Sequence, residues 1–113
     1  MDKVINLTPH DVIIIGDKGN HIIAFPPSGE IARCKKTTQL IDYIKVEGKI
    51  VPMVQTTYYD VTNLPEKKDN TYYIVSKLVA EAEIERTDLL IVNQIIRDSN
   101  KRVIGCKSLG PLK

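Results

Sequence analysis

The sequence predicts an α+β fold: a curved, mostly antiparallel sheet with one principal helix, at about residues 77–86, in a short βαβ unit. Short runs of β-branched and aromatic residues, separated by turns rich in Gly, Asn and Pro, predict the strands. Leu78 and Ala82 recur at helical spacing among good helix formers, which predicts the helix. With 113 residues, the chain is long enough for one core but not two, so residues 1–113 are expected to form a single domain.

The first half of the chain has the pattern of short strands joined by turns. Val12–Ile15 and His21–Phe25 flank Gly16–Asn20, which predicts a hairpin. Pro26 and Pro27 then take the chain out of the sheet, because proline cannot donate to a strand ladder. A second hairpin is expected around the turn at residues 47–49. The remaining predicted strands of this half are 4–7, 31–35, 41–46, 50–55 and the extended segment 56–61.

In the second half, a strand at 71–75 passes into the helix at Ser76. The next strand, Asp88–Val92, is apolar throughout beyond its first residue, the pattern of a strand covered on both faces. About twelve residues separate these strands, close to the minimum for a parallel crossover that contains a helix. A last hairpin is predicted from 95–97 and 102–106, around a turn at 98–100.

Composition is that of an ordinary soluble protein, with 42% hydrophobic and 27% charged residues and a net charge of +2. Charge is uneven, because five basic residues between Arg97 and Lys113 oppose Asp98 alone, giving +4 locally. A solvated basic tail is the favoured reading, and a basic wall facing an anionic ligand is the alternative. The small net charge disfavours nucleic-acid binding. No segment approaches the roughly 20 apolar residues of a membrane span. With no signal-peptide pattern at the N-terminus, a cytoplasmic protein is expected.

The sequence shows no catalytic or metal-binding pattern. His10 and His21 have no neighbour at metal-ligand spacing, and no nucleophile motif such as GxSxG occurs. Cys34 and Cys106 lack CxxC spacing and are expected to be reduced, although the possibility that they pair is left open. A non-enzymatic protein without a metal ion or cofactor is therefore predicted.

The junction at Ser76 is the best candidate for a ligand site. Serine ahead of a helix caps backbone amides, and that role alone explains its presence. A helix N-terminus after a strand also favours an anion, so Lys77 and Asn93 are expected beside a bound phosphate or ribose. Arg97 or Arg102 is expected to clamp the phosphate. Neither GxxxxGK[ST] nor GxGxxG is present.

Four of the five tyrosines occur as two adjacent pairs, at 58–59 and 72–73. In a strand, one member of each pair faces the core and the other faces out. An outward tyrosine either stacks on a base or lies at a subunit interface, and the interface is favoured. Together with the surplus of strand edges, this predicts a homo-oligomer.

Several blocks of the chain carry a resemblance. They are INLTPHDV (5–12), PPSGEIAR (26–33), YIVSKLVAEA (73–82), RTDLLIV (86–92) and IRDSNKRVIGCKSL (96–109). They resemble a family of small phage- and prophage-encoded proteins that mostly carry no assigned activity, which implies action inside an infected bacterium. More loosely, the chain is similar to phage Thoeris anti-defence proteins, compact oligomers that sequester cyclic ADP-ribose-type signals. No ligand-binding motif of those proteins matches residue by residue.

The first functional hypothesis is a phage-encoded binding protein that sequesters a nucleotide-derived immune signal without catalysis. Its ligand is expected to be a small anion, held by Ser76, Lys77, Asn93, Arg97 and Arg102. The alternative is a phage structural, assembly or protein-interaction module with no small-molecule ligand, in which tyrosine pairs and strand edges make assembly contacts. Weak nucleic-acid binding through the basic C-terminal hairpin and nucleotide cleavage are less favoured.

Overall fold

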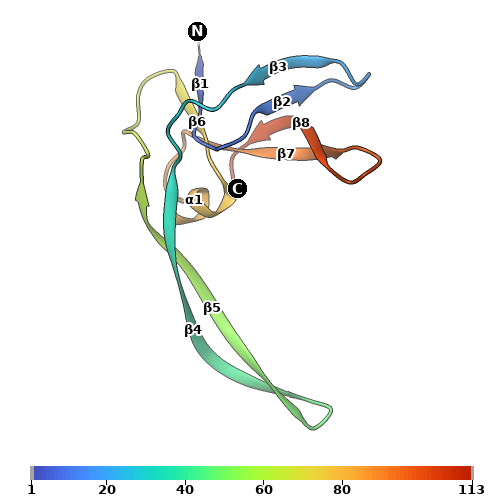
Figure 1. Ribbon diagram of the computed structural model, residues 1–113. Helices are drawn as coiled ribbons and strands as arrows, with labels where there is room; N and C mark the ends of the chain where they lie inside the picture. The colour runs from blue at the N-terminus through green and yellow to red at the C-terminus, as the bar shows by residue number, and fades with distance from the viewer. Residues whose placement is uncertain (1, 113) are drawn as a thin grey trace.

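The computed structural model describes residues 2–112 and divides them into a compact body and a long protruding hairpin (Figure 1). Lys113, the last of the basic residues noted above, lies outside the described residues. The elements in chain order are β1 (Lys3–Asn6), β2 (Val12–Ile15), β3 (His21–Phe25), β4 (Arg33–Val46), β5 (Lys49–Thr62), β6 (Thr71–Ile74), α1 (Lys77–Ala82), β7 (Leu89–Arg97) and β8 (Val103–Gly110).

The body is built on a six-stranded sheet with the order β1-β6-β7-β8-β2-β3. The sheet is mixed rather than mostly antiparallel. The pairs β1–β6, β6–β7 and β2–β8 are parallel, whereas β7–β8 and β2–β3 are antiparallel. The strand bounds of β2 and β3, with the turn between them, confirm the first predicted hairpin.

The predicted fold class is wrong, because the protein is mostly β, with 56% of residues in strands and 5% in the helix. Strands β6 and β7 are parallel neighbours, but the segment between them holds only the six-residue α1 and not a principal helix extending to residue 86. Three glutamates follow closely here: Glu81 is in the last turn, Glu83 is the C-cap and Glu85 lies just beyond, and their negative charge opposes the helix dipole. The last turn has no basic residue to compensate.

The core lies on both faces of β6. Tyr73 and Ile74 are adjacent, point to opposite faces of the strand, and are both fully buried. Tyr73 belongs to a cluster with Val79 and Ala80 of α1, and Ile74 packs with Val12 of β2. Because β2 lies three strands from β6 in the sheet order, this contact requires the sheet to curl strongly.

The protruding hairpin consists of β4 and β5, which form a two-stranded sheet of their own (Figure 1). Sequence patterns gave short separate strands in this region, but each strand runs unbroken for 14 residues. Their ladder extends to the pair Val46–Lys49, and Glu47 and Gly48 both have positive φ, as a two-residue hairpin turn of the primed type requires. This confirms the second predicted hairpin, while its separation from the main sheet was not foreseen. We call residues 33–62 the arm.

The arm makes the chain unusually extended. The radius of gyration is 17.5 Å, against roughly 13 Å for a compact domain of this length. At the base of the arm, Cys34 and Val61 pack against the body core, whereas the rest leaves the body. In the part of the chain that the structure describes, no helix has the length and apolar character needed to cross a membrane.

Candidate functional site

Ser76 and Lys77 lie at the start of α1. The Ser76 Oγ accepts a hydrogen bond from the Val79 amide at 3.3 Å, which confirms the predicted cap. Lys77 is exposed. A helix of six residues aligns few peptide dipoles, so the positive field at this end is weak.

Asn93 lies within a strand and not beyond its end. The sequence predicted a strand ending at residue 92, but β7 continues to Arg97 because β8 pairs with it along most of its length. Asn93 is therefore in the middle of β7, opposite Ser108. Pairing of β7 with β6 ends at Leu90, so Asn93 is three residues, roughly 10 Å, beyond the point where β6 leaves the sheet.

Arg97 and Arg102 flank the turn between β7 and β8. The guanidinium of Arg97 donates to the Lys101 carbonyl at 3.1 Å, and the Asp98 carboxylate accepts from the Arg102 amide at 3.0 Å. Arg97 is four strand residues, roughly 13 Å, beyond Asn93. The five predicted ligand residues are thus at the start of α1, within β7 and at the turn between β7 and β8. The cavity that Ser76 lines, of about 250 Å³, includes none of the other four.

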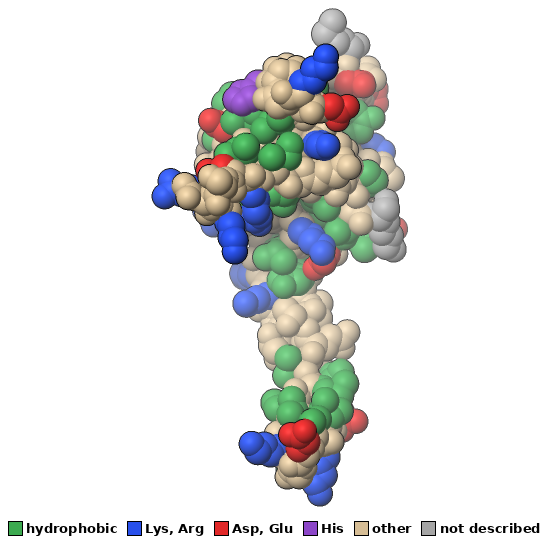
Figure 2. Space-filling view, turned by 90° about the vertical axis from the view of Figure 1, so that its right-hand side faces the viewer, with side chains coloured by type: hydrophobic (Ala, Val, Ile, Leu, Met, Phe, Trp, Pro, Cys, Tyr) green, Lys and Arg blue, Asp and Glu red, His purple; other side chains and the backbone are tan. Residues whose placement is uncertain are grey.

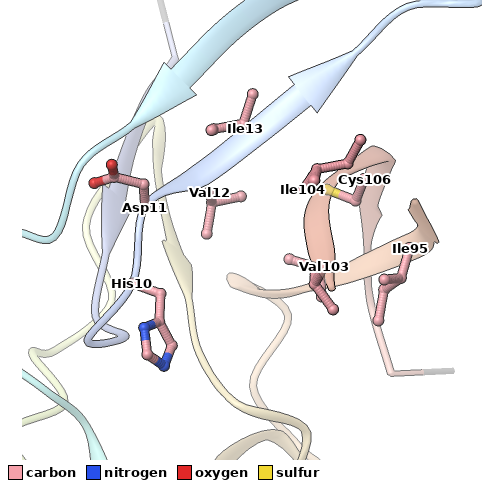
Figure 3. A pocket seen from close by; sticks show the side chains of 10 residues that line it. His10, Asp11, Val12, Ile13, Ile95, Val103, Ile104 and Cys106 are labelled. Carbon is pink, nitrogen blue, oxygen red and sulfur yellow. The ribbon is translucent and has the colours of Figure 1, made fainter. Parts of the chain in front are cut away.

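A cavity of about 580 Å³ lies elsewhere, between the loop before β2 and the hairpin formed by β7 and β8 (Figure 3). His10 and Asp11 stand at one side, and Ile95 and Val103 lie across from them. We call this cavity the apolar groove. Its lining residues are His10, Asp11, Val12, Ile13, Val92, Ile95, Val103, Ile104, Gly105 and Cys106.

Sequence reasoning missed the groove because its walls meet only through the pairing of β2 with β8. The available signal was the set of apolar residues near the β7–β8 turn, which the structure leaves exposed. Ile95 is 48% exposed, Val103 56% and Ile104 44%. Cys106 is at the floor, and burial raises the pKa of its thiol. Both Cys34 and Cys106 are free thiols.

The outer end of the arm is a second apolar surface. Nine hydrophobic side chains here are between 39% and 68% exposed. Figure 2 shows them as a hydrophobic patch at the far end, separated from the body by a polar neck. We call this end the arm tip; its exposed hydrophobic residues are Leu40, Ile41, Tyr43, Ile44, Val46, Ile50, Val51, Met53 and Val54.

Both faces of the arm tip are apolar. Residues that oppose each other in the ladder share a face, and neighbours along a strand alternate. The pairs Tyr43–Pro52 and Leu40–Val54 therefore lie on one face, and the pair Ile44–Val51 lies on the other. This is the pattern of strands that are covered on both sides.

The neck of the arm is polar. Its cross-strand pairs are Thr37–Thr57, Thr38–Thr56 and Gln39–Gln55. The hydroxyl oxygens of Thr38 and Thr56 are 3.4 Å apart. The neck thus needs no cover and holds the apolar tip away from the body.

The segment INLTPHDV forms a structural turn around Asn6, which is only 2% exposed. The Asn6 Nδ2 donates to the carbonyls of His10 and Phe25, both at 2.8 Å. Its Oδ1 accepts from the Thr8 amide at 2.9 Å and the Thr8 hydroxyl at 2.7 Å. All four positions of the amide are filled, so this motif ties β1, the following loop and β3 together.

A partly buried ion pair fixes the approach to β7. The guanidinium of Arg86 contacts both carboxylate oxygens of Asp88, at 2.8 and 2.7 Å, and also donates to the Pro65 carbonyl at 2.9 Å. Hydrogen bonding from Arg86 lowers the pKa of Asp88 below its usual value. The pair joins the 63–70 loop to the sheet.

Within residues 2–112, no group of three or more His, Cys, Asp or Glu side chains is placed to hold a metal ion. No family model, no curated protein and no solved structure matches the chain.

Proposed function

We propose that the chain is a non-catalytic protein-interaction module that works by assembly through its arm. The observation that carries this proposal is the arm tip, a two-stranded ribbon with apolar side chains exposed on both faces. An isolated two-stranded hairpin is marginally stable in water, and most of its stabilisation must come from packing against something else. The tip lies away from the body, so that cover has to come from another chain.

The free edges of the arm support the same proposal. Within residues 2–112, no third strand pairs with β4 or β5, so both outer edges present unpaired backbone groups. Natural proteins blunt or cover such edges because they template association. Exposed apolar patches that are rimmed by polar residues mark interaction sites for the same reason.

The setting follows from the resemblance: a phage- or prophage-encoded protein that acts in the cytoplasm of a bacterial host. In this role the body is a rigid platform, and the arm is the element that engages a protein partner. A structural or assembly role requires only that the arm bind its partner in a fixed geometry, and it requires no catalytic residue.

The test is a variant with a shortened arm. Thr38 and Thr56 oppose each other in the ladder, so residues 39–55 can be replaced by Asn-Gly, the favoured two-residue hairpin turn. Sedimentation of the labelled protein is measured both after purification and in bacterial lysate. We expect the full chain to sediment as a complex and the shortened variant to sediment as a monomer. The body should unfold in the same way in both proteins when it is followed by circular dichroism. A full chain that is monomeric in both conditions contradicts the proposal.

Sequestration of a nucleotide-derived signal stays a prediction. Because Arg97 is roughly 13 Å beyond Asn93 along β7, we expect a pocket that uses all five residues to form between chains. A thermal-shift screen against ADP-ribose, its cyclic isomers and cyclic dinucleotides tests it. A ligand at 100 times its dissociation constant stabilises the protein by roughly 2.7 kcal/mol. A shift that is lost in Arg97→Ala supports sequestration, and the lack of any shift counts against it.

A further inference from the structure

We propose that the arm tip docks in the apolar groove of a second copy of this chain. This inference rests on the proposed function and names the partner of the arm. It joins two exposed apolar features of the described residues, which are complementary in shape: one is a protruding ribbon and the other a concave surface.

The excess surface of the chain matches what a stable homo-oligomer buries. The accessible surface is 8457 Å². A compact monomer of 12.7 kDa exposes about 6,200 Å², so the chain carries an excess of about 2,200 Å². Specific interfaces bury about 1,200–2,000 Å² in total, and permanent homodimers bury more. Mutual burial of this excess by two copies therefore reaches the range of permanent dimers.

The tip of one chain cannot reach its own groove. Figure 1 shows the arm leaving the body on the side of α1, whereas the β7–β8 hairpin and β2 project from another side. The chain extends 56 Å along its longest axis. The paired strands of the neck keep the ribbon extended, so only another molecule can present a groove to the tip.

The charged residues of the arm tip and of the groove are compatible with association of two copies. The outer end of the arm carries Asp42 and Glu47 together with Lys45 and Lys49, a formal balance of zero. Two such ends do not repel each other. Asp11 is the carboxylate of the groove lining, and an ammonium group of the tip is a suitable partner for it.

Reciprocal docking gives a closed dimer. Each copy supplies one tip and one groove, and a two-fold axis makes the two contacts identical. Exchange of arms in this way also covers the free strand edges near the tip, which would otherwise invite open-ended association.

The experiment measures the mass of the purified full chain by sedimentation equilibrium, with variants on each side of the contact. Ile44→Asp combined with Ile50→Asp places one charge on each face of the tip. Thr38→Asp combined with Thr57→Asp is the matched control, because it places the same charges on the two faces of the polar neck. Val103→Asp charges the groove, and Ile84→Asp charges an exposed apolar position outside it.

We expect the wild type and both controls to have twice the mass of one chain at micromolar concentrations. The tip variant and Val103→Asp should dissociate at least about 30-fold more readily, the effect of losing an interface hot spot. Mixing these two variants should restore association in part, because the intact tip of one variant fits the intact groove of the other, which regains one of the two contacts of the dimer. Ile95→Asp serves as a second groove variant if Val103→Asp does not give the wild-type circular dichroism spectrum.

Three results would overturn the inference. If the groove variants associate as the wild type does while the tip variant dissociates, the tip docks elsewhere. If the purified chain is monomeric but sediments as a complex in lysate through its arm, the partner is a different protein. That result supports the proposed interaction function and contradicts docking between two copies. A chain that is monomeric in both conditions contradicts both.

Discussion

Replacing Asn6 by alanine should cost much of the stability of the body. The change removes two donated and two accepted hydrogen bonds from a side chain that is 2% exposed. His10 is exposed and Thr8 is half-buried, so water can replace part of what they lose. Phe25 is half-buried, so its carbonyl is less open to water than that of exposed His10.

The magnitude follows from the number of groups left without partners. A buried polar group without a partner costs about 1–3 kcal/mol, so two such groups give a loss of roughly 3 kcal/mol in the free energy of unfolding. For a domain of this size, 1 kcal/mol corresponds to about 4 °C in Tm. We therefore expect Asn6→Ala to lower the Tm by about 12 °C.

The assay is thermal unfolding followed by circular dichroism, at one fixed protein concentration because association shifts the Tm. Asn6→Asp is the informative companion. It keeps the acceptor for Thr8 but turns a charged oxygen toward the carbonyls of His10 and Phe25. Its stability should therefore rise as pH falls from 7 and the carboxylate protonates. A loss below about 1 kcal/mol for Asn6→Ala, with no pH dependence for Asn6→Asp, would refute this reasoning.

Two further predictions concern the titratable groups. Since the pKa of Asp88 is lowered in the folded state by its hydrogen bonds to Arg86, its contribution to stability is full above the unfolded value of about 4 and is lost as pH falls through the folded pKa. Acid titration of the urea midpoint should show this loss in the wild type, and Asp88→Asn should lack it while being less stable at pH 7; equal slopes would contradict the assignment. Because burial raises the pKa of the Cys106 thiol, alkylation by iodoacetamide at pH 8 should be slow there and faster at half-buried Cys34, as peptide mass spectrometry can measure. Comparable rates at both cysteines would show that the floor of the groove opens to solvent.

Local chemistry explains which parts of the fold the sequence predicts well. The hairpin from Val12 to Phe25 has its turn residues between two apolar runs, and the structure has the same strand bounds. The turn at Glu47 and Gly48 is confirmed for the same reason. Each of these predictions depends on neighbours within a few residues.

Most of the errors arise where contacts between distant parts of the chain determine which strands pair. Alternation and turn signals identify β4 and β5 as strands, but they do not specify which sheet a hairpin joins, so its separation from the body was missed. Asn93 was displaced from its predicted position because pairing with β8 lengthens β7. The overextended helix is a local error: the apolar spacing predicts a helix to residue 86, but the negative charge of Glu81, Glu83 and Glu85 opposes the helix dipole near residue 82. The groove depends on β2 lying beside β8, a contact between segments about 90 residues apart.

The six-stranded sheet is complete without the arm, since β4 and β5 contribute no strand to it. The neck can therefore change length without disturbing the body. Each residue added to both strands moves the tip outward by about 3.3 Å and turns it over. Since both faces of the tip are apolar, the turned tip still presents a hydrophobic surface in either direction. The length of the neck thus sets the spacing between associated bodies. A variant of this chain with a longer or shorter neck changes that spacing, while the contact at the far end keeps its apolar character.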